Sequence, residues 1–206
     1  MKIRSITYFC NPKYPLDEKA LQKAGIFLPE AKSSYEAAGY EVQTVRLATI
    51  PFPTLLGEEH IEKLPELVGQ IDNIAQELHI GYISLGPALP DMPHSYEVIP
   101  EGIFVSKNVF FGGLMADKAR DLDLAAVKAC ADVICKSATI EPNGFANLQF
   151  AALANVDAGT PFFPAAYHDA NADESAFAIA TESADLAVQA FEGAKSIGEG
   201  RRNLAG

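Results

Sequence analysis

Basic residues, cysteine and tryptophan are all scarce in this sequence of 206 residues. It contains no tryptophan and three cysteines, and its 16 Lys and Arg residues stand against 27 Asp and Glu residues, for a formal net charge of -11. A surface with this charge repels nucleic-acid backbones and anionic membranes. We therefore expect neither nucleic acid nor a membrane among its partners.

Long apolar runs are also missing. Only a few apolar residues precede Asn11 and Pro12, which is too short a stretch for a secretory signal. No run approaches the roughly 18 apolar residues of a membrane-spanning helix. Cys10, Cys130 and Cys135 leave an odd cysteine and lack a metal-binding spacing, which favours reduced thiols. We expect a soluble, cytoplasmic protein.

Strand-like and helix-like patterns alternate along the chain. Short runs rich in β-branched and aromatic residues predict strands, and apolar residues at spacings of three and four predict helices. Pro29 predicts a kink in the first helix, and Pro65 divides the second. The strands are expected at residues 3–10, 40–47, 82–85, 108–111, 148–156, 161–166 and 177–181, and the helices at residues 17–38, 58–79, 121–136 and 184–194.

Strands separated by helices are typical of βαβ units, in which each crossover makes neighbouring strands parallel. The predicted fold class is therefore α/β, with parallel βαβ units in an open sheet or a barrel. We expect one α/β domain over residues 1–195 and a flexible tail over residues 196–206, because the tail is small and polar. In such folds ligands meet the loops at the carboxyl ends of the strands.

Polar residues near the predicted strand ends are the candidates for chemistry. The proline-rich connection over residues 86–100 is long, and long connections in compact domains are often functional. Histidine titrates near neutrality and exchanges protons with substrates, so His94 and His168 are the candidate acid and base. The candidate catalytic carboxylates are Asp169 and Glu182, and the candidate ligand-binding residues are Cys10, Tyr96, Asn143, Asn147 and Tyr167.

Each candidate also has a structural interpretation. A turn histidine is often a hydrogen-bonded loop residue, a rim tyrosine often buries its ring, and a strand-end cysteine such as Cys10 is often a small buried hydrophobe. Cys10 is a nucleophile only if its thiolate is stabilised. A metal site built from His94, His168 and either Asp169 or Glu182 has suitable ligand types, but adjacent strand residues point to opposite faces. The sequence leaves the metal and any cofactor unknown.

Several runs of the sequence resemble one protein family. They are residues 40–46, 143–156, 160–168 and 182–186. Together they are similar to domain of unknown function 711, whose members are often labelled pyruvate formate-lyase family proteins, and the similarity covers roughly residues 1–195. The resemblance implies an α/β barrel related to the glycyl radical enzymes and built from two half-barrels of parallel strands.

The resemblance also implies that this chain forms one half-barrel, because family members are longer and the chain corresponds to their N-terminal half. An isolated half leaves open sheet edges, so we expect a homo-oligomer, in the first place a homodimer, or a separate second-half chain as partner. The resemblance implies no activity. We expect no glycyl radical chemistry, because no glycyl-radical consensus surrounds Gly206 at the end of the chain.

Two functions fit these residues. The first is an enzyme that acts on a small polar metabolite at the strand-end rim, with His94 and His168 in acid–base chemistry and Asn143, Asn147 and Tyr167 positioning the ligand. The alternative is a non-catalytic ligand-binding or assembly module, in which the same residues hold a metabolite or stabilise loops. The fold class does not separate these functions, because function depends on the site.

Overall fold

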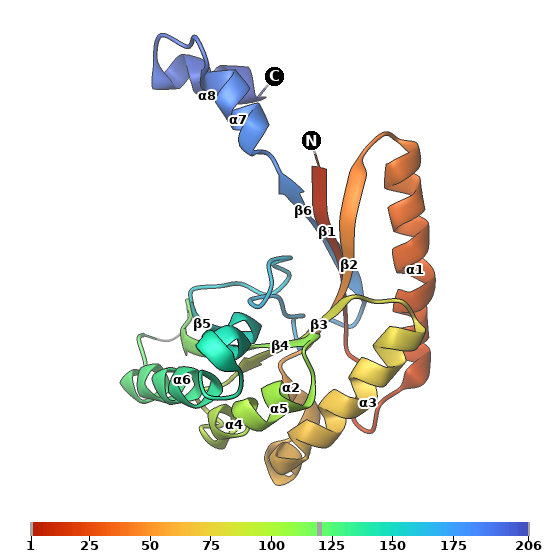
Figure 1. Cartoon of the computed structure of the whole chain (residues 1–206), viewed down its shortest axis with the longest axis vertical. Coiled ribbons are helices and arrows are strands. Elements are labelled where there is room, and N and C mark those ends of the chain that lie inside the picture. Colours follow the sequence, from red (N-terminus) through yellow and green to blue (C-terminus); the bar gives the residue numbers. More distant parts are fainter. Residues whose placement is uncertain (1, 119–120, 206) are drawn as a thin grey trace.

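A curved sheet of six strands forms the centre of the molecule (Figure 1). The computed structural model describes residues 2–118 and 121–205. The strand order is β5-β4-β3-β2-β1-β6, in which β1 to β5 run parallel and β6 runs antiparallel to β1. The strands are β1 (Lys2–Cys10), β2 (Glu41–Thr49), β3 (Tyr82–Ala88), β4 (Val109–Ala116), β5 (Phe150–Ala154) and β6 (Ala176–Glu182).

Helices α1, α3, α5 and α6 cover the convex outer face of this sheet (Figure 1). The predicted α/β fold, with parallel βαβ units in a half-barrel, is therefore confirmed. Within residues 2–118 and 121–205, no helix is both long and apolar enough to cross a membrane. The helical elements are α1 (Glu18–Ala37), α2 (Phe52–Leu56), η1 (Glu58–Lys63), α3 (Leu64–Glu77), α4 (His94–Glu97), α5 (Ile99–Val105), α6 (Leu124–Ser137), η2 (Pro142–Gln149), α7 (Ala184–Phe191) and α8 (Ile197–Ala205).

Local signals in the sequence set the bounds of the first helices. Asp17 caps α1, since its carboxylate accepts a hydrogen bond of 3.0 Å from the backbone N–H of Lys19. Helix α1 continues through Pro29 as one element. Pro65 occupies the first turn of α3, where its missing N–H costs nothing, and the short helix η1 ends just before it. The predicted division of this helical segment is confirmed.

Strand β4 runs through Gly112 and Gly113, where the sequence pattern predicts a strand end. A Cβ atom on Gly113 would lie 2.7 Å from Sγ of Cys130 on α6, and one on Gly112 would lie 2.8 Å from Leu153 on β5. A side chain at either position would force these neighbouring atoms to shift. The two glycines therefore allow close packing around the strand and do not end it.

The connection over residues 86–100 contains more regular structure than the sequence pattern predicts. Strand β3 continues to Ala88, and α4 and the start of α5 follow. Tyr96 of α4 is buried, and its hydroxyl donates a hydrogen bond of 2.5 Å to the carbonyl of Leu114 on β4. Packing against the neighbouring strand thus orders a segment whose prolines suggest a loop.

The C-terminal part departs from the predicted pattern in two places. Residues 161–166 form no strand, so that prediction is wrong. Residues 197–205 form helix α8, which packs against α7 so closely that a Cβ atom on Gly200 would lie 2.3 Å from the ring of Phe191. Together α7 and α8 form a hairpin that extends beyond β6, away from the other helices (Figure 1). The apolar contact with α7 explains a helix in a polar segment.

Residues 160–168, named here the strap, lie over the concave face of the sheet. Oγ of Ser84 on β3 donates a hydrogen bond of 2.6 Å to the carbonyl of Ala166, and Oγ1 of Thr7 on β1 donates one of 3.3 Å to the carbonyl of Pro161. Both hydroxyl residues are buried. Two polar side chains of the sheet therefore hold a segment that has no strand partners of its own.

Candidate functional site

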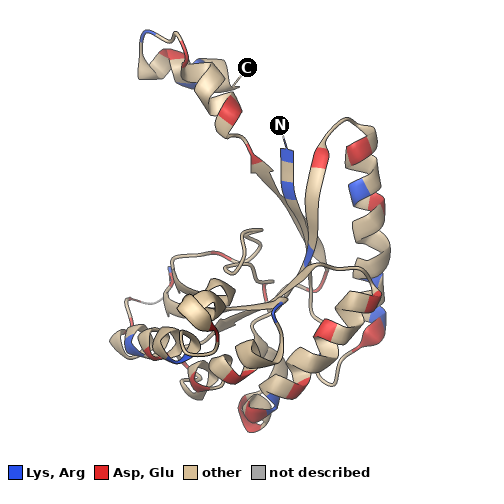
Figure 2. Cartoon of the chain, in the orientation of Figure 1, with Lys and Arg blue, Asp and Glu red and all other residues tan. Residues whose placement is uncertain are grey.

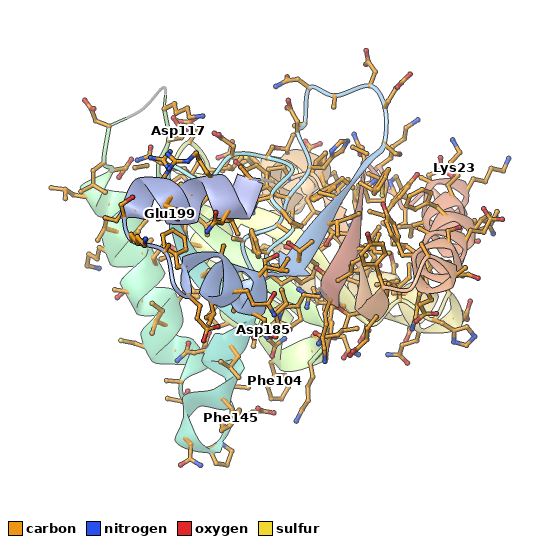
Figure 3. All side chains as sticks on the ribbon, turned by 90° about the horizontal axis from the view of Figure 1, so that it is seen from above. Lys23, Phe104, Asp117, Phe145, Asp185 and Glu199 are labelled. Atoms are coloured by element: carbon orange, nitrogen blue, oxygen red, sulfur yellow. The ribbon has the colours of Figure 1, made fainter. Side chains whose placement is uncertain are left out.

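The strap ends at a pocket of about 380 Å³ on the carboxyl side of β1. The turn after β1, the start of α1 and residues 168–175 form its wall. One lining residue, Lys23, projects from α1 at the margin of the molecule (Figure 3). Loops that follow parallel strands meet at this edge, so the pocket lies where the fold class predicts a ligand. It is named here the strand-end pocket.

His168 is the buried titratable group of the strand-end pocket, with only 5% of its surface exposed. Its backbone N–H donates a hydrogen bond of 2.9 Å to the carbonyl of Thr49, and its ring lies 6.3 Å from the ring of Phe9. Burial lowers the pKa of the imidazole, and a hydrogen bond to the backbone of Glu174 and the charge of Asp169 oppose this effect. The imidazole is therefore neutral at pH 7, the form that accepts a proton.

Charged side chains of both signs line the pocket around His168. Lys13 and Lys23 contribute ammonium groups, and Asp173 and Glu174 contribute carboxylates. The neighbouring Asp169 is exposed, and its carboxylate accepts a hydrogen bond of 2.9 Å within a local turn. Such a mixture of donors and acceptors suits a small polar ligand better than an apolar one.

Cys10 ends β1 close to this pocket but belongs to the main hydrophobic core. It lies in that core with Ile6 and Tyr8 of the same strand, on the side that faces the helices. Burial raises the pKa of the Cys10 thiol to about 12. The thiol is therefore protonated at neutral pH, which favours the interpretation of Cys10 as a packing residue over a nucleophile.

His94 lies at the start of α4 and does not line the strand-end pocket. Its Nδ1 lies 2.8 Å from a carboxylate oxygen of Glu97, and its Nε2 hydrogen-bonds to Glu62. The hydrogen bonds to Glu62 and Glu97 raise the pKa of this exposed imidazole. The two predicted catalytic histidines thus have opposite pKa shifts, and the structure does not bring them into one pocket.

The two candidate tyrosines use their hydroxyl groups inside the fold. Tyr96 donates to the carbonyl of Leu114, and Tyr167 donates a hydrogen bond of 2.8 Å to the carbonyl of Val156. Burial, together with three nearby aspartates, raises the pKa of Tyr167. Both hydroxyls therefore already donate to backbone carbonyls of the fold.

Asn143, Asn147 and Glu182 lie at the opposite end of the sheet, so the prediction that they share one rim with His168 is wrong. Both asparagines lie in η2, which precedes the parallel strand β5 and therefore sits at its amino end. Strand β6 runs antiparallel, so Glu182 pairs with Lys2 at the start of β1. The sequence pattern located these strand ends but not the direction of the last strand.

The described chain, which omits residues 1, 119, 120 and 206, contains no group of three His, Cys, Asp or Glu side chains close enough to hold a metal ion. The metal interpretation requires His168 to meet His94 and either Asp169 or Glu182. Because the structure places His94 and Glu182 away from His168, that interpretation has no support.

A comparison with protein families complements this geometry. The family model described as Uncharacterised ACR (DUF711) matches residues 1–204. The chain belongs to this family. The resemblance predicted from the sequence is thus confirmed, although the family description assigns no activity. No curated protein shows significant similarity to the chain.

Sequence reasoning missed one feature of this DUF711 protein, a pair of arginines on the concave side of the sheet. Arg4 lies on β1 and Arg46 on the adjacent strand β2, and both line a cleft near the amino ends of these strands. A cation inside each strand, between uncharged residues, was the available signal. Figure 2 shows basic residues on both of these strands, whereas the charged residues of the outer helix α3 are all acidic.

Proposed function

We propose that this DUF711 protein binds a small polar metabolite in the strand-end pocket and that His168 exchanges a proton with it. The observation that carries the proposal is a buried neutral imidazole at the wall of a pocket of about 380 Å³. A neutral imidazole accepts a proton from a bound substrate, which is general-base chemistry. Removal of a proton leaves negative charge on the substrate, and Lys13 and Lys23 supply positive charge at the same pocket.

The substrate class follows from the lining of the pocket. Both ammonium groups and carboxylates line it, and Asn11 adds a side-chain amide. A small molecule with hydroxyl, carbonyl or carboxylate groups finds partners on several sides. The reaction class that fits one neutral base and nearby cations is proton abstraction or base-assisted hydrolysis.

The proposal is tested by a thermal-shift screen of polar metabolites, followed by turnover assays with the compounds that stabilise the protein. His168→Gln keeps a hydrogen-bonding side chain but removes the base, so we expect a loss of turnover of about 100-fold or more. His60→Gln is the matched control, because His60 lies in η1 outside the pocket. As the pH is lowered, kcat/KM should stay constant to below pH 6.5. It should fall only at the lower pH at which the imidazole of His168 becomes protonated.

Full turnover in His168→Gln would overturn the catalytic role. The second predicted histidine is tested in parallel, because His94→Gln removes the imidazole held by Glu62 and Glu97. Unchanged turnover in that variant removes His94 from the mechanism. Ligands that stabilise the protein without any turnover support the non-catalytic binding function.

A second candidate function, assembly of copies of this chain, is favoured by apolar side chains on the α7–α8 hairpin. Val188 is 64% exposed and Ile197 is 76% exposed. A homodimer formed through this hairpin buries them both. Size-exclusion chromatography with light scattering should then show a dimer at micromolar concentration, and a monomer for the double variant Val188→Asp with Ile197→Asp. A monomeric unmodified protein contradicts this function.

A further inference from the structure

A second cleft, of about 600 Å³, opens on the concave side of the sheet near the amino ends of β1 and β2. It is named here the arginine cleft. Residues from β1, β2, the strap and β6 line it, among them Arg4, Ser5, Arg46, Phe163 and Glu182. Ser5 pairs with Thr44 in the sheet, whereas the strand-end pocket lies beyond the last residues of these strands. The two sites are therefore separate.

Arg46 is a half-buried cation in this cleft without an acidic partner. Its guanidinium carbon lies 5.0 Å from the ring centre of Phe163 and 5.7 Å from that of Tyr82, so two aromatic rings flank it. Its Nε donates a hydrogen bond of 3.0 Å to Oγ1 of Thr44. No carboxylate of the described residues lies within ion-pair distance of it. The guanidinium of Arg46 therefore keeps further N–H groups that can donate to a ligand, and the two rings and Thr44 fix its orientation.

The surroundings of Arg46 leave its charge uncompensated. Burial lowers its pKa, and the charge of Arg4 lowers it further, while Tyr82 opposes the shift. An anion placed near both arginines removes the repulsion between them and restores the partners lost on burial. The positive charges of Arg46 and Arg4 therefore favour the binding of an anion in the cleft.

Ser5 provides a second and independent observation. It is fully buried, lines the arginine cleft, and its hydroxyl oxygen has no hydrogen-bond partner within the described structure. A buried hydroxyl without a partner destabilises the folded state. Rotation about the Cβ–Oγ bond directs the hydroxyl hydrogen, so the group can donate to an acceptor that reaches it from the cleft. Such an orphaned donor beside two cations points to an acceptor that the chain itself does not supply.

We propose that the arginine cleft binds the oxyanion of a small metabolite, a carboxylate or a phosphate group, through Arg46, Arg4 and Ser5. The planar guanidinium of Arg46 donates two parallel hydrogen bonds to two oxygens of such a group. Glu182 lies across β1 from Arg46, on β6, and repels a second anionic group on that side. The favoured ligand is therefore small and carries one anionic end.

The test is isothermal titration calorimetry with two probes, inorganic phosphate and glycolate, at constant ionic strength. The unmodified protein should bind at least one probe, and the tighter of the two identifies the group as phosphate or carboxylate. Arg46→Gln should weaken that binding about tenfold or more, since it removes a charged bidentate donor. Arg201→Gln is the matched control, because it removes the same charge from the exposed helix α8 and should leave binding unchanged.

Ser5→Ala is a second variant that tests the same site if Arg46→Gln does not fold. Because the Ser5 hydroxyl has no partner among residues 2–118 and 121–205, this variant should keep or raise the melting temperature and still bind the probe more weakly. The proposal is overturned if neither probe binds, or if Arg46→Gln and Ser5→Ala bind as the unmodified protein does. It is also overturned if His168→Gln abolishes binding and Arg46→Gln does not, since the anion then occupies the strand-end pocket.

Discussion

The two faces of the sheet are covered in different ways. The outer face carries large apolar side chains, such as Ile83 and Phe111, against a layer of helices. The concave face carries Thr7, Ser84 and Arg46, and a strap without secondary structure covers part of it. Apolar packing needs only shape and volume, whereas polar groups on a sheet face need specific partners. The outer face therefore specifies the fold, and the concave face offers sites.

The difference also explains where both sites lie. The strap covers the middle of the concave face. The arginine cleft lies on this face beside Phe163, and the strand-end pocket lies at the C-terminal end of the strap, beyond the carboxyl end of β1 and against the start of α1. Phe163 of the strap touches the arginine cleft, and His168 ends the strap at the strand-end pocket. The strap thus contributes residues to both sites.

The largest effect is expected on the outer face. Phe111 is fully buried and its ring lies 5.9 Å from the ring of Phe52. Phe111→Ala leaves a cavity in the main core, so urea unfolding should show a loss of about 3–5 kcal/mol. Phe104→Ala is the control, since Phe104 is 77% exposed and points away from the body of the molecule (Figure 3). Equal losses in the two variants would contradict the assignment of the core.

A smaller effect is expected on the concave face. Ser84→Ala removes the donor of the 2.6 Å hydrogen bond to Ala166 and leaves that carbonyl buried without this partner. The expected loss of stability is about 1–3 kcal/mol. Relative to the unmodified protein, backbone hydrogen exchange should become faster in the strap and stay unchanged in the outer helices. Ser33→Ala, on the exposed side of α1, should change neither measurement. Unchanged exchange in the strap would show that the hydroxyl does not hold it.

The smallest effect is a pH dependence with opposite signs for two histidines. The pKa of His168 is lowered in the folded state, so its contribution to stability is present above pH 6.5 and is lost as the pH falls. The pKa of His94 is raised, so its contribution is present below pH 6.5 and is lost as the pH rises through the folded pKa.

The measurement for the two histidines is the urea midpoint at about pH 5.5 and about pH 7.5, on either side of the ordinary histidine pKa. His168→Gln should lessen the loss of stability on acidification, and His94→Gln should increase it. The same change of slope in both variants would contradict the opposite pKa shifts.

Much of the outer face was predictable because it depends on local pattern. Asp17 marks the start of α1, and Pro65 marks the start of α3, where the structure has them. The exceptions are positions where packing overrides the pattern. Gly112 and Gly113 resemble a turn in sequence, but they lie inside a strand. Leu153 and Cys130 pack where Cβ atoms of larger residues would lie, which accounts for glycine at both positions.

The candidate site was predictable only in part. His168 lies at a strand-end pocket as the position of its segment predicts, but His94 lies in another cluster and Glu182 at the other end of the sheet. Residue order does not state whether an edge strand runs parallel or antiparallel. That choice alone moves Glu182 from one end of the sheet to the other.

The sequence by itself determined the fold class, most of the strands, and membership of the family, because these depend on hydrophobic period, caps and a long shared motif. Only the tertiary structure decided which polar residues meet. The strap places Phe163 on Arg46 across more than a hundred residues of chain, and Ser5 in the same cleft has no hydrogen-bond partner among the described residues. Such neighbours arise from the pairing and curvature of distant strands, which no local pattern records.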